Sequence, residues 1–384
     1  MTGLMTSPTV QSLLEWGSAQ GVQINGILPK NIIGRGLGMV ATRDIRKGET
    51  LVTVPSSIAR SVQSTPDWIL EPLSHASCQA VLAVSLCLER DPGFTNWKRL
   101  FPTWDEVNAS HPMRWPRKLV ELLPRSTKSV LHDQEKKFWE DWLDVKYKFP
   151  GIGRNDFLHA WIIVNSRAFL YNPTAAREGH RDHVALVPVA DLFNHHTRGG
   201  CSARHEGSQY VVRAVRNYQR GEELHVNYGK HSNDYLLVEY GFVMPDYENF
   251  YDITSLDEFI CGRFTYQQAT YLKTKDAWGH FELDTHGAVY RTKVALRLLT
   301  LPEIDWPDYL DGKKEITAED MVFVNGLLRE ILGSWQKTLL SKMRTVEYSY
   351  IGEEGARDLL RYRLRQLRGL LMSALSRLDR PGWE

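Results

Sequence analysis

The pattern of apolar and polar residues divides the chain into two β-rich stretches and two helical ones. Over residues 31–55, short β-branched runs are separated by glycines, which is typical of strands joined by tight turns. A helical pattern follows from about residue 60 to 169, strand patterns return near residue 184, and the pattern is again helical beyond residue 255. The expected order is therefore β, α, β, α.

Individual elements follow from the spacing of the apolar positions. Helices are expected where apolar side chains recur every three to four residues. Asn155 or Asp156 is placed to cap the helix expected at 156–170. Strands are expected where β-branched residues run together or alternate with polar ones. The expected helices are 10–20, 77–90, 133–148 and 156–170, and the expected strands are 184–189, 208–215 and 223–227.

Near the C-terminus, one helical segment has an apolar stripe and a basic face. The stripe consists of Leu360, Leu364, Leu367, Leu371 and Leu378, and the basic face of Arg357, Arg361, Arg365 and Arg368. Two interpretations of the basic face stay open. It contacts an acidic protein surface, or it is a solvated face in which acidic residues are interspersed.

Two segments of the β-rich stretches resemble each other. ATRDIRKGETL (41–51) and AVRNYQRGEEL (214–224) share Ala, Arg, a basic residue, Gly, Glu and Leu at identical offsets. Each predicts a strand, a glycine turn and a second strand. Because the unit occurs only twice, it indicates one folding unit that spans the helical stretch, and not a repeat array.

Composition limits the class of protein. The 384 residues, 42% hydrophobic and 24% charged, suffice for two to three packed units of an ordinary globular protein. A net charge of +1 gives no global field that attracts nucleic acid or anionic lipid. No apolar run approaches the ~18 residues that cross a bilayer. Neither a nucleic-acid partner nor a membrane partner is expected.

The cysteines and the N-terminus bear on the compartment. The N-terminal residues lack a basic region followed by an apolar one, so secretion is not expected. The four cysteines are scattered and form no C-x-x-C pair, which argues against disulfides and a cysteine zinc cluster. We expect a cytoplasmic or nuclear protein, and a monomer, because heptad repeats of a coiled coil are lacking.

Four motifs occur in a fixed order: GRGLGMVATRDIRKGE (34–49), NSRAF (165–169), ADLFNHH (190–196) and YGKHSNDYLLVEYGF (228–242). Their order and spacing resemble a split SET domain of the Rubisco large-subunit lysine methyltransferase-like class. Any one motif alone would be weak evidence, whereas four in order make the resemblance specific.

The resemblance implies an α+β fold. A SET-domain β-fold of short strands is interrupted by a helical insertion and followed by an all-α C-terminal domain. The implied boundaries are 1–60 for the N-terminal helix and first part of the SET domain, 61–155 for the helical insertion, 156–254 for the second part of the SET domain, and 255–384 for a helical substrate-binding-like domain.

The resemblance also implies a cofactor, S-adenosyl-L-methionine, and a set of site residues. The catalytic residue is Tyr228. The implied cofactor-binding residues are Gly36, Leu37, Gly38, Arg167, Asn194, His195, Tyr228 and Tyr240, and the implied substrate-channel residues are Ser166, Arg167, Asp191 and Tyr240. The sequence departs from the family at Arg35, where an acidic residue is often found.

The residue types suit methyl transfer to an amine. An asparagine side chain offers a donor and an acceptor to one polar ligand. Plainer interpretations also exist: the G-x-G is a hairpin turn, Arg167 extends from a core helix, and Asn194 and His195 satisfy a tight turn. A metal site is not expected, because ligation needs three or four convergent side chains and no such array is visible.

The expected function is S-adenosylmethionine-dependent methylation of a lysine in a non-histone protein, docked by the helical C-terminal domain. Two alternatives stay open: a methyltransferase for a protein histidine or a small-molecule acceptor, and a catalytically inactive SET-like interaction module.

Overall fold

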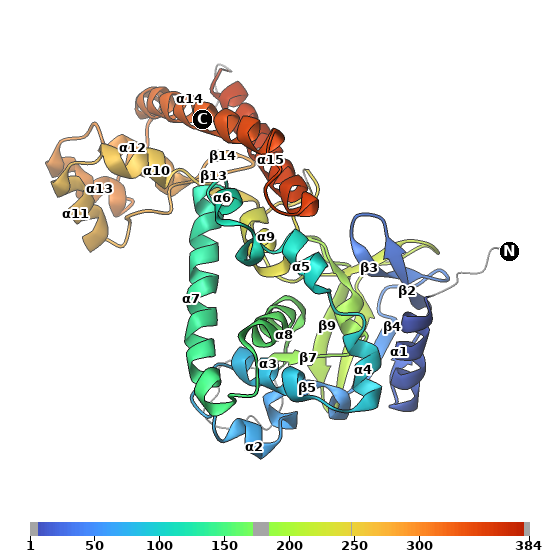
Figure 1. The fold of residues 1–384 in the computed structure, drawn as a ribbon. Helices are drawn as coiled ribbons and strands as arrows, with labels where there is room; N and C mark the ends of the chain where they lie inside the picture. The colour runs from blue at the N-terminus through green and yellow to red at the C-terminus, as the bar shows by residue number, and fades with distance from the viewer. Residues whose placement is uncertain (1–6, 172–183, 247, 380–384) are drawn as a thin grey trace. The chain divides into compact units, whose positions relative to one another are not determined.

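The computed structural model describes most of the chain, which folds into two compact units (Figure 1). The described residues are 7–171, 184–246 and 248–379. The first unit comprises residues 1–107 and 133–230, and the second comprises residues 108–132 and 231–384. The four domain boundaries expected from the sequence stay a prediction.

An eight-stranded sheet forms the centre of the first unit. Its strands are β1 (Gln23–Ile24), β2 (Ile27–Ile32), β3 (Gly36–Ala41), β4 (Thr50–Pro55), β8 (Asn194–His195), β9 (Cys201–Glu206), β10 (Gln209–Ala214) and β11 (Glu223–Val226). Their order is β1-β4-β10-β9-β11-β3-β2, and β8 pairs with β11. A second sheet has the order β5-β7-β6, with bounds Arg60–Ser61, Val184–Leu186 and Phe169–Leu170. The central sheet combines strands from before and after the helical stretch. In the second sheet, β5 and β6 come from the two ends of that stretch, where strands were not expected.

Helices of the first unit confirm the expected pattern. They are α1 (Pro8–Ala19), α2 (Asp67–Leu70), α3 (Cys78–Leu88), α4 (Pro92–Lys98) and α8 (Arg154–Arg167), while α5 (Trp104–Ser110) and α7 (Arg125–Lys148) run across the boundary between the units. α3 is buried on nearly all sides, as its apolar sequence predicts, and packs along α8.

The expected bounds of two helices are wrong. α7 begins at Arg125, eight residues before the expected start, because its polar first turns carry no apolar periodicity. α8 is capped by Gly153 without a side-chain hydrogen bond, and neither Asn155 nor Asp156 is the cap. Both lie in the first turn, where the negative charge of Asp156 interacts favourably with the positive end of the helix dipole. α8 also ends at Arg167, because the next residues form β6.

The two similar segments, 41–51 and 214–224, pair with each other. Ile45 and Tyr218 exchange both backbone hydrogen bonds, each of 2.9 Å, as an antiparallel bridge. The side-chain bonds repeat across the same axis. Asp44 accepts from a backbone N–H of the opposite segment at 3.0 Å, and Asn217, its counterpart, does so at 2.8 Å. The internal similarity therefore corresponds to a pseudo-twofold pair of turns that joins the two β-rich stretches.

The second unit is mainly helical and also holds a small sheet. Its helices are α6 (Arg117–Val120), α9 (Asn233–Tyr240), α10 (Asp257–Ile260), α11 (Tyr266–Thr274), α12 (Tyr290–Leu298), α13 (Trp306–Leu310), α14 (Ala318–Glu347) and α15 (Glu354–Leu378). The sheet has the order β12-β13-β14, with bounds Ile253–Ser255, Glu282–Asp284 and Gly287–Ala288. The expected helical C-terminal region is confirmed, and the sheet is an addition that the sequence pattern did not predict.

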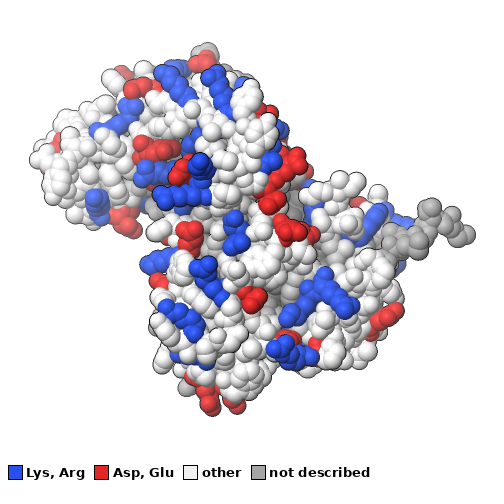
Figure 2. Space-filling view, viewed as in Figure 1, with Lys and Arg blue, Asp and Glu red and all other residues white. Residues whose placement is uncertain are grey.

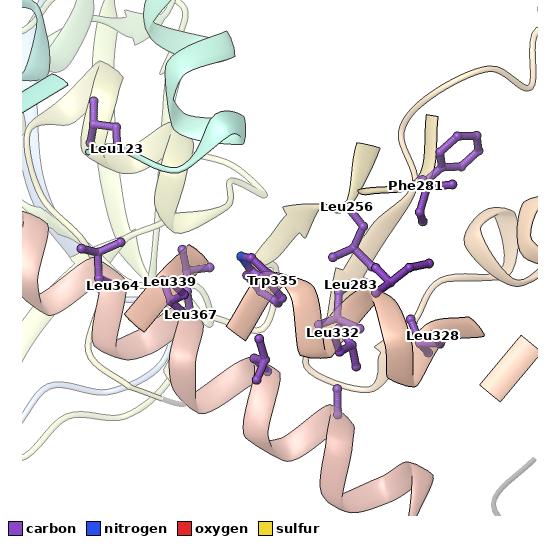
Figure 3. Close-up of a cluster of buried hydrophobic side chains, with 14 of the residues drawn as sticks. Leu123, Leu256, Phe281, Leu283, Leu328, Leu332, Trp335, Leu339, Leu364 and Leu367 are labelled. Carbon is purple, nitrogen blue, oxygen red and sulfur yellow. The ribbon is translucent and has the colours of Figure 1, made fainter. Parts of the chain in front are cut away.

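The apolar stripe of α15 packs against α14 and forms the core of this unit. Figure 3 shows Trp335 and Leu339 of α14 close to Leu364 and Leu367 of α15. Leu256, directly after β12, and Leu283 of β13 extend the cluster to the small sheet. Burying such side chains contributes about 1.5–3 kcal/mol each, so the stripe stabilises the helical pair.

A buried arginine links three elements of the second unit. Arg363 of α15 is fully buried, and it donates to Asp234 of α9 at 2.8 Å and to Asp252, just before β12, at 2.7 Å. Thr127, in the first turn of α7, also donates to Asp234 at 2.7 Å. Burial alone would raise the pKa of Asp234, but the Arg363 guanidinium outweighs it and holds this pKa below its usual range. The network fixes α9 against α15.

Charged side chains of both signs are interspersed on the visible face (Figure 2). Within the described residues, no helix has both the length and the apolar character needed to cross a membrane.

Replacing Asp234 by Asn is expected to destabilise the second unit by about 1.5–3 kcal/mol, because Arg363 loses a buried charge-assisted hydrogen bond while Asp252 still neutralises its charge. The measurement is urea denaturation followed by tryptophan fluorescence at pH 7. Arg365→Met, on the exposed side of α15, is the control and should change stability by about 0.5 kcal/mol or less. Equal effects of the two substitutions would contradict a structural role for the buried network.

Candidate active site

Strand β11 brings the sequence motifs of the first unit together. It runs antiparallel to β3, with Leu224 opposite Met39, and parallel to β8, with His225 opposite Asn194. Two residues after β11 the chain reaches Tyr228. The glycine-rich strand, the Asn-His pair and the tyrosine therefore lie around one short strand.

Asn194 lies against the backbone of Gly38. Its Nδ2 donates to Oε1 of Glu223 at 2.8 Å, and a Cβ added at Gly38 would lie 2.6 Å from each of these two atoms. Real Cβ atoms essentially never come so close, so a side chain at this position would displace the Asn194 amide and the Glu223 carboxylate. Burial alone would raise the pKa of Glu223, but its hydrogen bonds with His225 and Asn194 outweigh this and keep the pKa below the usual range. Glu223 is therefore an ionised acceptor at neutral pH.

Tyr228 is fixed at both its backbone and its hydroxyl. Its N–H donates to Nδ1 of His195 at 3.0 Å, and its hydroxyl donates to the Phe193 carbonyl at 2.7 Å. The rings of His195 and Tyr228 lie 5.1 Å apart. Burial raises the pKa of Tyr228 to about 12. The hydroxyl therefore stays protonated over the physiological range, with its hydrogen committed to a carbonyl.

Arg167 and Asp191 form a buried pair. Nη1 of Arg167 donates to the backbone carbonyl of Asp191 at 2.9 Å and to Oδ2 at 3.0 Å, and Trp97 donates to the same carboxylate oxygen at 3.0 Å. Oδ1 accepts no hydrogen bond from the described residues. Burial raises the pKa of Asp191, and the Arg167 charge offsets this only in part. The pair holds the end of α8 against the ADLFNHH segment.

The turn that carries Asp191 begins at a strained residue. Val189 has a φ of 69°, and it is fully buried before the 3-10 turn Ala190–Leu192. A β-branched residue in this region costs about 1–3 kcal/mol and persists only where its surroundings impose it. The packed core of the first unit thus imposes the backbone path that leads to Asp191.

The remaining channel and glycine residues have simpler environments. The Ser166 hydroxyl donates back to the Ile162 carbonyl at 2.8 Å, so it is satisfied within α8. Gly36 and Leu37 begin β3, where they pair with β2, so they directly follow the hairpin turn. Gly36 has a φ of 73°, and a Cβ there would meet open space. Leu37 is half-buried.

Tyr240 belongs to the second unit and ends α9. Ser232 caps this helix, and Gly241 ends it with a left-handed φ of 75°. The Tyr240 ring is half-buried, and its centroid lies 6.2 Å from that of Phe242. The expected roles of Tyr240 in cofactor binding and in the channel stay a prediction.

Both histidines of ADLFNHH use Nδ1 for backbone contacts. His195 accepts from Tyr228 N at 3.0 Å, and His196 accepts from Arg198 N at 3.1 Å. Within the part of the chain that the structure describes, no group of three or more His, Cys, Asp and Glu side chains is placed to hold a metal ion.

Sequence reasoning missed Glu223, His225 and Trp97. A signal for the first two was present: in ELHVN (223–227) apolar and polar residues alternate, so Glu223 and His225 share one face of the strand. Trp97 had no such signal, because its contact with Asp191 joins residues 94 positions apart.

This arrangement is matched by known proteins. A family model described as the SET domain matches residues 36–229, half of the chain. The chain belongs to the SET-domain family, a family of protein methyltransferases.

Among relatives, the chain is 24% identical to the ribosomal lysine N-methyltransferase set11 of Schizosaccharomyces pombe, over 83% of this chain and 81% of that protein. It is 24% identical to the human SET domain-containing protein 4, over 60% of this chain and 57% of that protein. The mouse actin-histidine N-methyltransferase is 25% identical, over 60% of this chain and 41% of its own length.

Solved structures share the fold over nearly the whole chain. The structure of Rubisco LSMT bound to sinefungin and monomethyllysine has a TM-score of 0.64 at 17% identity, covering 97% of this chain and 94% of that one. The structure of Rubisco LSMT bound to AdoMet has a TM-score of 0.61 at 20% identity, covering 97% and 94%. At these identities the match shows the fold: mixed α+β with helices at the C-terminal end.

Alanine substitutions at Gly38 of β3 and at Gly34 of the preceding turn should separate site effects from backbone effects. Gly38→Ala pushes a methyl group into Asn194 and Glu223, so we expect a loss of S-adenosylhomocysteine affinity of at least about tenfold. Gly34→Ala meets open space but strains a positive φ, so it should cost about 1 kcal/mol of stability and leave affinity nearly unchanged. Calorimetric titration and thermal melting of both variants test this. Unchanged affinity in folded Gly38→Ala would contradict a ligand site beside this strand.

Proposed function

We propose that the protein is an S-adenosylmethionine-dependent protein-lysine N-methyltransferase that acts on a non-histone protein. The observation that carries the proposal is the contact of Tyr228 with His195 and Phe193, on the strand beside Asn194 and Gly38. Relatives named ribosomal lysine N-methyltransferases support a lysine acceptor.

The residues present fit the cofactor. The lack of a side chain at Gly38 lets the Asn194 amide and the Glu223 carboxylate lie against the strand backbone, and the Asn194 amide offers its Oδ1 to a polar ligand. Gly36, Leu37, His195 and Arg167 are the other groups of the first unit that would hold the cofactor. The proposed role of Tyr240, in the second unit, rests on the resemblance of its motif. When bound, the cofactor supplies a methyl group on a cationic sulfur.

Tyr228 is the proposed catalytic residue. Its hydrogen is committed to the Phe193 carbonyl, so the phenol oxygen presents its lone pairs to the site. Those lone pairs accept an N–H of the acceptor amine, which aligns its nitrogen for in-line displacement. Ser166, Arg167 and Asp191 are proposed to line the channel through which the amine enters. The same role for Tyr240 rests on the resemblance of its motif.

The nucleophile must be the neutral amine. Deprotonating a free lysine, with a pKa of ~10.4, near pH 7.4 costs about 4 kcal/mol. A channel that desolvates the ammonium next to a cationic sulfur lowers this cost by burial and by like-charge repulsion. Water can then remove the proton, and no dedicated base is required.

The second unit is proposed to dock the protein substrate. On α15, Arg365 and Arg368 are exposed, whereas Arg361 is paired with Asp358 at 2.7 Å. The exposed pair provides positive charge for an acidic surface of a partner.

Tyr228→Phe is expected to lower methyl transfer by about a hundredfold, because the acceptor nitrogen loses its alignment. Binding of S-adenosylmethionine should change by less than about threefold, since the variant removes only a hydroxyl whose bond is to Phe193. Tyr210→Phe, at another buried tyrosine of the first unit, is the control and should retain activity. Equal transfer by Tyr228→Phe and the parent would contradict the assigned role.

The acceptor is identified by incubating the protein and Tyr228→Phe with labelled S-adenosylmethionine and a cell lysate, followed by mass spectrometry of the modified residues. Methyl-lysine that depends on Tyr228 supports the proposal. Methyl-histidine instead would favour the alternative that the actin-histidine N-methyltransferase relatives suggest. Binding without any transfer would point to an inactive module.

The pH dependence should not report Tyr228. Because its pKa is about 12, the hydroxyl is un-ionised below about pH 11, and the rate should rise with pH as the acceptor amine loses its proton. We expect parallel rate–pH profiles for the parent and Tyr228→Phe between pH 6 and 10. An inflection that is present only in the parent would show that Tyr228 ionises in this range.

A further inference from the structure

A charged cluster lies behind Asn194 on β11 and the β2–β3 turn. Glu223 uses its two oxygens differently: Oε1 accepts from Nδ2 of Asn194 at 2.8 Å, and Oε2 lies 3.3 Å from Nε2 of His225 and 3.6 Å from Nη1 of Arg35. Arg35 and His225 are also 3.3 Å apart. The carboxylate is therefore held at both ends, by an amide on one side and by basic groups on the other.

This arrangement fixes the orientation of the Asn194 amide. An ionised carboxylate has no hydrogen to donate, so only the NH2 side of the amide can face Glu223. Rotating the amide by 180° would place two oxygens at hydrogen-bond distance without a hydrogen between them. The low pKa of Glu223 keeps the constraint in force at neutral pH. Oδ1 of Asn194 therefore stays an acceptor pointing away from Glu223.

We infer that Glu223 is a positioning residue for the ligand's α-ammonium group, and that it acts through Asn194. This inference rests on the proposed function, because it assumes an amino-acid sulfonium ligand beside Gly38. The fixed Oδ1 accepts an N–H of the ammonium, and the negative charge of Glu223 behind the amide favours that cation. Arg35 partly offsets the negative charge of Glu223. The basic residue before the glycines, where the family often has an acidic one, therefore has a physical role.

The inference predicts opposite effects of two single substitutions. Glu223→Gln removes the charge and leaves a side chain that can donate or accept, so both orientations of the Asn194 amide become possible. Arg35→Gln keeps the Asn194–Glu223 bond and removes the competing cation. Glu223→Gln should weaken the preference for a ligand that carries the ammonium group over one that lacks it. Arg35→Gln should preserve or strengthen this preference.

The experiment is calorimetric titration of the full chain with two ligands. One is S-adenosylhomocysteine, and the other is 5′-(3-carboxypropylthio)-5′-deoxyadenosine, which is identical except that it lacks the amino group. The measured quantity is the ratio of the two affinities. In Glu223→Gln the ratio should fall by about tenfold through weaker binding of S-adenosylhomocysteine, while the deaminated ligand binds as it does to the parent. Arg35→Gln should show a ratio at least equal to that of the parent.

Glu206→Gln is the matched control. Glu206 pairs with Arg204 of β9 and Arg213 of β10, and it has no contact with Asn194. Its ratio should equal that of the parent, and thermal melting verifies the fold of every variant. If Glu223→Gln does not fold, Arg35→Gln decides, since a ratio below that of the parent contradicts the inference.

The outcomes separate the inference from the proposed function. An unchanged ratio in Glu223→Gln, or an equal loss for both ligands, means that Glu223 has only a structural role, and the inference is wrong while the proposed function stands. If neither ligand binds the parent, the proposed function itself fails.

Discussion

The pairing of β11 with three neighbours is the constraint on which the candidate site depends. A strand of four residues contacts β3, β8 and β9, and each contact brings in a different part of the chain. Moving its register by one residue would turn Glu223 and His225 to the opposite face and would separate Asn194 from Gly38. The pseudo-twofold pair of turns holds this register, because Ile45 and Tyr218 join the two β-rich stretches just before β11 begins.

Local sequence patterns predicted much of the fold. The helices α1 and α3, the strands β10 and β11 and the mainly helical C-terminal region all follow from periodicity and turn residues. The similarity of 41–51 to 214–224 predicted that the two β-rich stretches form one unit. Bounds were wrong where polar turns hide a helix start, as at Arg125, and where a helix is capped without a side chain, as at Gly153.

Long-range polar contacts could not be predicted. Arg363 lies among arginines of an amphipathic helix, and only the fold shows that it is buried between Asp234 and Asp252. Glu223 likewise reads as a surface residue of an alternating strand, although it determines how Asn194 faces the site. In both cases the partner is 29 or more positions away, so that local spacing carries no information about it.

The two networks show how one chain combines stability and chemistry. In the second unit, a buried arginine paired with two carboxylates fixes helices. In the first unit, polar groups around β11 fix the orientation of the Asn194 amide and of the Tyr228 hydroxyl. A crystal structure of the protein with S-adenosylhomocysteine tests the central claim most directly. We predict that the ligand lies along the Gly36–Gly38 strand, with its amino group at Asn194 and its sulfur facing the Tyr228 oxygen. A ligand bound elsewhere, or a Tyr228 hydroxyl turned away from it, would contradict the proposal.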